Sequence, residues 1–473
     1  MQTKSKKLTR TITVFMLAMI NVAAVGNIRN WPLTAEYGFS SLFFFILAAL
    51  IFFIPVALVS AELATGWPQK GGVFVWVKEA FGHKMGFLAI WLLWLENVFY
   101  YPLVLSFIAA TTAYIFNPAW AHNPLYTIGI ILFFFWAATI ANLFGMKISG
   151  WISTIGAVVG TFIPGVFIIV LGLMWYFKGN PLQINLSWES LIPEMNSFTQ
   201  LAIFSGILLS LAGIEMSAVH AAEVKDPQKN YPRAILLSAF LILGLSIIGV
   251  LAIAIVIPKS EISLIAGSLQ AFSYFLNAYG LNWLLPAMAI LIAIGSLGGL
   301  STWIIGPSKG LLAAAQSGDL PPYFRRITKS GMPKTLLITQ ASIVSLLSLL
   351  FVFMPTLSSA YWILTVLAAQ LYLVMYIMLF AAGIKLRYKR PGVERAYKLP
   401  GKYVGMWVTA GIGILGGIFM LVVGFFPPSE TISNNVWGYF CTLFLGMVIC
   451  CAAPFIIEHF KKASWNTLLD HEK

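Results

Sequence analysis

The sequence has 473 residues, of which 59% are hydrophobic and only 10% are charged, and its mean hydropathy is +0.87. This composition excludes an ordinary soluble domain, because a water-exposed surface does not tolerate so many apolar side chains. Repeated apolar stretches of about 20 residues match a hydrocarbon core of about 30 Å, and a backbone in lipid must form helices or a closed barrel. The alternation typical of a barrel is absent, so we predict an all-α membrane protein.

The formal net charge of +13 does not indicate nucleic-acid binding, because the basic residues lie in short segments between the apolar stretches. With twelve spans and a cytoplasmic N-terminus, every Lys and Arg falls on the cytoplasmic side except Arg29, Lys178 and Lys259. This asymmetry follows the positive-inside rule. We predict cytoplasmic N- and C-termini and, since no eukaryotic targeting sequence is evident, a bacterial inner membrane.

We predict about twelve transmembrane helices joined by short loops. Their expected bounds are 11–31, 41–65, 85–116, 125–143, 151–177, 201–222, 233–257, 284–314, 335–353, 361–386, 403–426 and 436–460. The segment GGVFVWVKEAFG after the second span is too short to cross the membrane, so we expect a half-buried helix against the inner face. Cys441, Cys450 and Cys451 lack metal-ligand spacing and are expected to be small core residues.

Two of these spans carry residues that a continuous lipid-facing helix avoids. The first contains AAVGNIRNWP, with Gly26 and Arg29, and the sixth contains SLAGIEMSAVH, with Gly213 and Glu215. They open two successive sets of five spans. Paired interrupted helices at matching positions indicate an inverted-repeat transporter with a binding site near the membrane midplane, although close helix packing is another use of such glycines.

The expected organisation follows from these two sets of spans. It comprises a cytoplasmic N-terminus 1–10, a ten-helix transport core 11–386 with repeats 11–177 and 201–386, two accessory helices 403–460 and a cytoplasmic tail 461–473.

Several segments resemble the bacterial glutamate/GABA antiporter family of the amino acid/polyamine/organocation superfamily. They are GGVFVWVKEAFG, LAGIEMSAVHAAEVKDPQKNYPRA, VIPKSEISLIAG and STWIIGPSKGLLAAAQSGDLPP, and the resemblance extends to about Pro454. It implies a five-plus-five inverted-repeat core with two additional C-terminal helices, and the exchange of one amino acid for another. It also implies functional roles for Gly213, Ile214, Glu215, Tyr372 and Tyr376, and a gating role for Trp303, for which core packing is the alternative.

Three positions depart from that family's pattern. Gly298 stands where the acid-resistance members have a glutamate, Arg29 where they have a tyrosine, and Glu96 where they have a neutral glutamine. The long C-terminal plug of those members is also missing. The substrate pair and any acid-gated closure are therefore left open.

An α-amino acid presents a carboxylate and an ammonium close together, and interrupted helices supply partners for both. Backbone N–H groups freed at the first break can bind the carboxylate, and carbonyls freed at the second can accept from the ammonium. Two mid-span tyrosines four residues apart share one helix face and are expected to face the site, although anchoring at the membrane interface is the usual alternative for membrane tyrosines. The expected substrate-binding residues are Val25, Gly26, Asn27, Arg29, Leu211, Ala212, Gly213, Glu215, Tyr372 and Tyr376.

Charged side chains within membrane spans are costly, so each one indicates a specific role. Arg29 either binds a carboxylate, gates the outer side or snorkels to water. An ionised carboxylate costs about 2.5 to 3.5 kcal/mol at a span centre, so we expect Glu215 to brace its broken helix. Glu96 either titrates during transport or selects the substrate, or its carboxylate is satisfied by neighbouring hydroxyls or by Arg29. Charges at cytoplasmic ends form salt bridges that control inward opening or stay solvated, and these are Glu62, Glu79, His220, Glu223 and Asp226.

The sequence predicts a secondary-active amino-acid transporter that works by alternating access, with exchange as the main hypothesis. Proton-coupled symport through Glu96 is the alternative, and a transporter-like sensor or channel is a third. No nucleotide-binding loop, hydrolase motif or Cys/His cluster occurs, so we expect no enzyme activity and no cofactor. The expected partners are a small amino acid and the lipid bilayer, with protons in the alternative, and no nucleic acid.

Overall fold

The computed structural model describes residues 12–69, 71–144, 156, 158–193, 198–215, 224–354, 356–427 and 436–465. Its regular structure in these ranges is helical, apart from one isolated bridge between Ile12 and Val224. Ten segments are long and apolar enough to cross a membrane. The prediction of an all-α membrane protein is confirmed.

The ten membrane-length segments correspond to ten of the twelve predicted spans. They are Gly38–Gly66 (η2 Gly38–Ser40, α3 Ser41–Ala48, η3 Ala49–Phe53 and α4 Ile54–Gly66), α6 His83–Phe116, α7 Pro124–Leu143, Val159–Phe177 (η5 Val158–Phe162 and α9 Ile163–Phe177), α13 Pro227–Val256, Asn282–Gln316 (η8 Asn282–Leu284 and α15 Leu285–Gln316), Lys334–Phe353 (α16 Lys334–Leu347 and α17 Leu350–Phe353), α18 Leu357–Lys389, α19 Lys402–Val423 and α20 Val436–His459.

The remaining two predicted spans, the first and the sixth, are the two that were expected to be interrupted. The first consists of α1 (Val14–Val25), η1 (Ile28–Asn30) and α2 (Trp31–Ala35), and the sixth begins with α11 (Phe198–Leu211). Each of these pieces is shorter than a span of about 20 residues. The total of twelve spans and the inverted repeat stay predictions.

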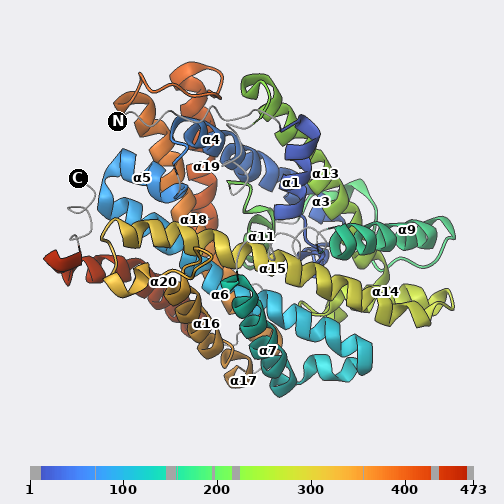
Figure 1. Cartoon of the computed structure of the whole chain (residues 1–473). Coiled ribbons are helices and arrows are strands. Elements are labelled where there is room, and N and C mark those ends of the chain that lie inside the picture. Colours follow the sequence, from blue (N-terminus) through green and yellow to red (C-terminus); the bar gives the residue numbers. More distant parts are fainter. Residues whose placement is uncertain are drawn as a thin grey trace.

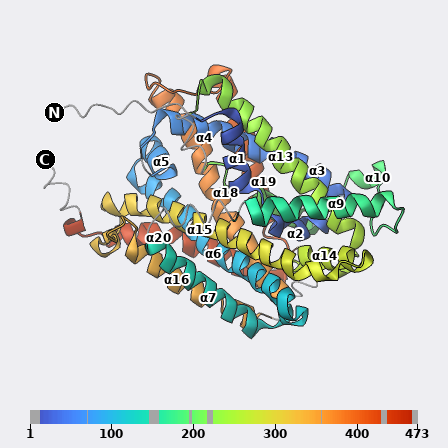
Figure 2. The same cartoon turned by 45° about the vertical axis from the view of Figure 1, so that its right-hand side comes forward.

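The helices form a tilted bundle in which α18 takes a central position. On one side α18 packs against α6, which in turn packs against α7 and α15. On the other side it packs against α4, α11 and α19. Figures 1 and 2 show α6, α7, α15 and α16 running alongside one another, with α1 and α13 across from them. Helices α6 and α18 therefore lie near the centre of the bundle, with α15 packed against α6.

Short helices cover the two ends of the bundle. The predicted half-buried helix after the second span is present as α5 (Val73–Phe81), whose residues Val73 to Val77 are buried while Phe81 is exposed. At the opposite end lies α14 (Gly267–Ala278), which we did not predict. Of the three cysteines, Cys450 is buried and Cys441 is exposed, so the expectation of three core cysteines is wrong for Cys441.

The second half of the first span is fixed by three glycines. A Cβ atom on Gly249 of α13 would lie 2.2 Å from the ring of Trp31. Likewise, a Cβ on Gly267 would lie 2.6 Å from Pro32, and one on Gly206 would lie 2.2 Å from Leu33. Because each side chain of α2 occupies the space that a larger residue would need, α2 is held tightly between α11, α13 and α14.

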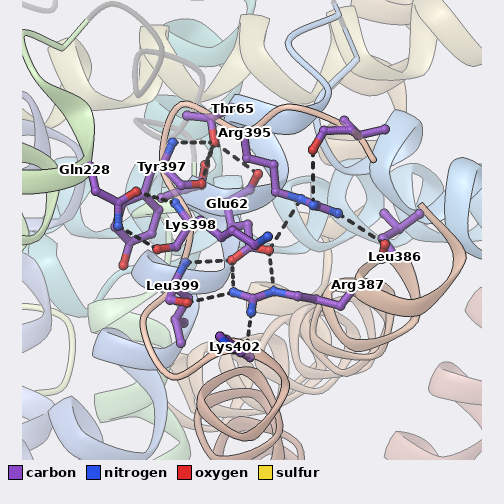
Figure 3. A network of polar contacts seen from close by, with 12 residues as sticks. Glu62, Thr65, Gln228, Leu386, Arg387, Arg395, Tyr397, Lys398, Leu399 and Lys402 are labelled. Atoms are coloured by element: carbon purple, nitrogen blue, oxygen red, sulfur yellow. Dashed lines mark hydrogen bonds and ion pairs between the residues drawn. The ribbon is translucent and has the colours of Figure 1, made fainter. Parts of the chain in front are cut away.

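A buried ion cluster ties α4 to α18 at the α5 end of the bundle (Figure 3). Arg387 of α18 donates from Nε to Glu62 Oε1 at 2.7 Å and from Nη2 to Glu62 Oε2 at 2.5 Å. The Arg395 Nε atom lies 3.4 Å from the same carboxylate, and the backbone N–H of Leu399 donates to it at 2.8 Å. The prediction that Glu62 forms salt bridges is confirmed.

The same cluster anchors the connection between α18 and α19. Tyr397 donates its backbone N–H to Thr65 Oγ1, and Thr65 Oγ1 donates to the Tyr397 carbonyl at 3.1 Å. Gln228 of α13 pairs with both backbone groups of Lys398. The segment 390–401 is therefore bonded to α4 and α13 as well as to the helix it follows, as Figure 3 shows.

We predict that Glu62→Ala destabilises the protein by about 3 to 5 kcal/mol, because it leaves Arg387 and Arg395 buried without their carboxylate. The unfolding temperature of the detergent-purified variant measures this loss. The matched control is Glu79→Ala, whose partner Arg390 lies 3.9 Å away in a much more exposed pair. Its effect should stay below about 1 kcal/mol. Equal losses in the two variants would contradict the assignment.

Candidate functional site

The first span is interrupted at Gly26 and Asn27. Both residues have extended backbone angles, with φ −65° and ψ 117° at Gly26 and φ −150° and ψ 124° at Asn27. The Asn27 side chain accepts from the backbone N–H of Arg29 at 2.9 Å, and Ser268 of α14 donates to the Ile28 carbonyl at 3.1 Å. The predicted break is confirmed, and side chains satisfy part of the backbone that it exposes.

One detail of that prediction is wrong. The backbone N–H of Gly26 is not freed, because it donates to the carbonyl of Val22 at 2.7 Å and continues the hydrogen bonds of α1 by one residue. A substrate carboxylate therefore finds this donor already occupied. Val25, the last residue of α1, is buried.

The second break follows Leu211, where α11 ends. Gly213 has φ +108°, a backbone conformation that side chains with a Cβ atom rarely adopt. A Cβ atom there would also lie 2.7 Å from the indole ring of Trp303 on α15. The Gly213 N–H donates to the hydroxyl of Tyr376 on α18 at 3.1 Å. Glycine is thus required at this position by both its backbone angle and its packing.

Glu215 is held by the predicted tyrosine pair. Tyr372 donates to Oε1 at 2.5 Å and Tyr376 donates to Oε2 at 2.6 Å. The two rings stack with their centroids 4.5 Å apart. Since both oxygens accept from hydroxyls, the carboxylate is bonded on both sides within the described structure. This geometry agrees with the expected bracing of the broken helix by Glu215.

Arg29 and Glu96 lie deep inside the protein, with exposed fractions of 1% and 2%. The guanidinium of Arg29 lies over the ring of Tyr100, 4.5 Å from its centroid, which does not fit a side chain that snorkels to water. Glu96 accepts from the Asn97 side-chain amide at 2.7 Å. Glu96 is also close enough to interact electrostatically with both Glu215 and Arg29.

Aromatic side chains connect the two breaks. The ring of Tyr100, under Arg29, has its centroid 6.5 Å from that of Trp303, which covers Gly213. The neighbouring Tyr101 donates its hydroxyl to the Trp303 carbonyl at 2.9 Å. The structure therefore brings together Arg29 from η1, Glu96 from α6, Trp303 from α15 and the Tyr372–Tyr376 pair from α18.

The structure describes two of the four remaining charged residues that were predicted at cytoplasmic ends. His220 and Glu223 lie outside the described residues, so their predicted salt bridges stay predictions. Glu79 lies 3.9 Å from Arg390, in agreement with its predicted ion pair. Asp226 precedes α13 in a left-handed conformation, with φ 46°. In the described ranges, no group of three or more His, Cys, Asp or Glu side chains could hold a metal ion.

Sequence reasoning missed two neighbours of the charged residues. Tyr100 supports Arg29, and Asn97 donates to Glu96. Tyr100 follows Glu96 by four residues, so it lies on the same helix face, and this spacing could have identified it. The pairing of Tyr100 with Arg29 joins separate spans, and no local pattern indicates it.

The chain is similar in sequence to known transporters. A family model described as amino acid permease matches residues 10–449. A transporter of Legionella pneumophila, described as uncharacterized, is 46% identical over 94% of this chain and 96% of its own length. A glutamate/gamma-aminobutyrate antiporter of Lactococcus lactis is 33% identical over 95% of this chain and 90% of its own length.

A probable agmatine/putrescine antiporter of Lactococcus lactis is 25% identical over 80% of this chain and 78% of its own length. The resemblance to bacterial glutamate/GABA antiporters, read from four segments of the sequence, is thus confirmed along nearly the whole chain. The chain belongs to the amino acid permease family of the amino acid/polyamine/organocation superfamily.

Proposed function

We propose that the protein is a secondary-active transporter that exchanges one amino acid for another by alternating access. The substrate binds between the two interrupted spans, where buried charges and exposed backbone groups meet. The observation that carries this proposal is the contact of Gly213 with both Trp303 and Tyr376, which joins the second break to α15 and α18. Relatives whose names describe antiporters support exchange rather than one-way uptake.

The second break serves the ammonium group of the substrate. The last carbonyls of α11 have no partner within the helix, and those near Leu211 and Ala212 accept from the ammonium. Glu215 fixes the geometry of this break through Tyr372 and Tyr376. Trp303 acts as the gate, since its ring covers the backbone at Gly213.

The first break serves the other end of the substrate. Val25, Gly26 and Asn27 form the wall on this side, because the two extended residues leave a gap between α1 and η1. The α5 end of the bundle, with the Glu62 cluster, faces the cytoplasm of a bacterial inner membrane. Its many Lys and Arg residues support this orientation under the positive-inside rule.

Counterflow in proteoliposomes tests the exchange. A thermal-shift screen over the twenty amino acids, γ-aminobutyrate and polyamines first identifies compounds that bind. Vesicles loaded with an unlabelled binder are expected to take up the labelled compound, while empty vesicles take up little. Equal uptake into empty vesicles would contradict obligatory exchange.

We predict that Tyr376→Phe lowers the transport rate at least about tenfold. The substitution removes the donor to Glu215 Oε2 and the acceptor of the Gly213 N–H, and each buried group left unpaired costs about 1 to 3 kcal/mol. Initial rates in proteoliposomes measure the effect.

The matched control for this prediction is Tyr372→Phe, which removes one hydrogen bond to Glu215 and no contact with Gly213. Its rate should fall less than that of Tyr376→Phe. Wild-type rates in Tyr376→Phe, with the protein folded and monodisperse, would remove the tyrosine from the proposed mechanism.

Proton-coupled symport is the second candidate, and it rests on Glu96. This carboxylate is buried within the electrostatic reach of Glu215 and Arg29, and its side-chain donor is a neutral amide. A proton on Glu96 would change the charge of the site between transport steps. We predict that Glu96→Gln flattens the dependence of transport on pH. The pH profile of initial rates measures this, and an unchanged profile would count against a coupling role.

A further inference from the structure

We propose that the Arg29 side chain, rather than the backbone of the first break, binds the α-carboxylate of the substrate. The protein would then distinguish an amino acid from the amine that remains after decarboxylation. This inference rests on the proposed function and names one recognition group within its site.

The Arg29 side chain has hydrogen-bonding capacity that the protein does not use. Its exposed fraction is 1%, and its Nε and Nη1 atoms are buried without a hydrogen-bond partner among the described residues. A buried guanidinium with unused donors is costly unless an anion pairs with it. Glu96 lies within electrostatic range of the guanidinium, but Nε and Nη1 donate to no group in the described structure. These two donors are therefore available to a substrate carboxylate, which guanidinium groups bind strongly.

Three of the backbone donors at the two breaks are already engaged. The N–H of Gly26 donates to the Val22 carbonyl, and the N–H of Arg29 itself donates to the Asn27 side chain. At the second break, the N–H of Gly213 donates to Tyr376. These three donors cannot hold a carboxylate without breaking an existing hydrogen bond, whereas Nε and Nη1 of Arg29 can.

The guanidinium is also held in place before any ligand arrives. It lies over the ring of Tyr100, where the cation–π attraction fixes its plane. The backbone around Arg29 is held by Ser268, which donates to the carbonyl of Ile28, and by Trp31, which packs against Gly249. Little further ordering is needed when a carboxylate binds, and this favours affinity.

The position of Arg29 suits the α-carboxylate in particular. The ammonium of an amino acid is attached to the same carbon, so its partners must lie close to those of the carboxylate. Tyr100 lies between Arg29 and Trp303, and Trp303 contacts Gly213 at the second break. The proposal therefore places the α-carboxylate at Arg29 and the ammonium at the second break, on either side of Tyr100 and Trp303. A diamine or an ω-amino acid leaves Arg29 without its α-carboxylate partner.

Binding to the purified full-length protein in nanodiscs tests this inference with matched pairs of compounds. The pairs are glutamate with γ-aminobutyrate, ornithine with putrescine, and arginine with agmatine, and in each the second compound lacks only the α-carboxylate. For every amino acid that binds, we expect wild-type affinity to exceed that for its amine by about 10-fold to 100-fold, the range of a charged hydrogen bond. In Arg29→Gln this ratio should fall below about threefold.

Two further variants separate recognition from folding. Tyr100→Leu removes the ring that holds the guanidinium and should reduce the ratio, while Tyr100→Phe keeps the ring and should preserve it. If Arg29→Gln does not fold, this pair decides the question alone. An undiminished ratio in Arg29→Gln or in Tyr100→Leu overturns the inference and leaves the proposed function standing. If no amino acid binds or exchanges in the wild-type protein, the proposed function itself fails.

Discussion

The structure depends on the requirement that every backbone polar group within lipid finds a partner. A helix that stops inside the membrane leaves N–H and C=O groups without their usual partners, and lipid offers none. Here side chains from other elements take over part of that task. Asn27 caps η1, Ser268 bonds the Ile28 carbonyl, and Tyr376 accepts from Gly213. The breaks therefore exist only because distant helices supply the missing partners, and this ties α14 and α18 to the interrupted spans.

One side chain of α18 joins the second break to a buried carboxylate. Tyr376 serves the broken backbone and Glu215 at once, since its hydroxyl accepts from Gly213 and donates to the carboxylate. A movement of α18 would disturb both bonds together. Three turns further along α18, Arg387 is bonded to Glu62 of α4. One helix thus carries contacts both to the proposed binding site and to the ion cluster that holds the segment 390–401, so the two regions are mechanically linked.

Local sequence signals were sufficient for the ten membrane-length helices, for both breaks and for α5, but not for α14. Apolar length, misplaced glycines and short amphipathic stretches are visible within a few residues. They were insufficient for tertiary pairing. Glu62 was expected to form a salt bridge, but its partner Arg387 is 325 residues away. The prediction that the N–H of Gly26 is free was wrong for a different reason. The helical hydrogen-bond pattern extends one residue beyond the last helical residue, so a break frees donors later than the glycine that marks it.

Gly298 and Glu96, two of the positions that depart from the family pattern, lie on helices that pack against each other. The glutamate expected at Gly298 belongs to α15, where the helix approaches the fifth span so closely that a Cβ atom on Gly156 would lie 2.8 Å from the Gly298 backbone. The carboxylate at Glu96 belongs to α6, the helix packed against α15. Glu96 lies within the electrostatic range of Arg29. Arg29 and Glu96 partly neutralise each other in a region of low dielectric, where either charge alone would be costly. Substitution of one without the other should therefore perturb the site more than substitution of both.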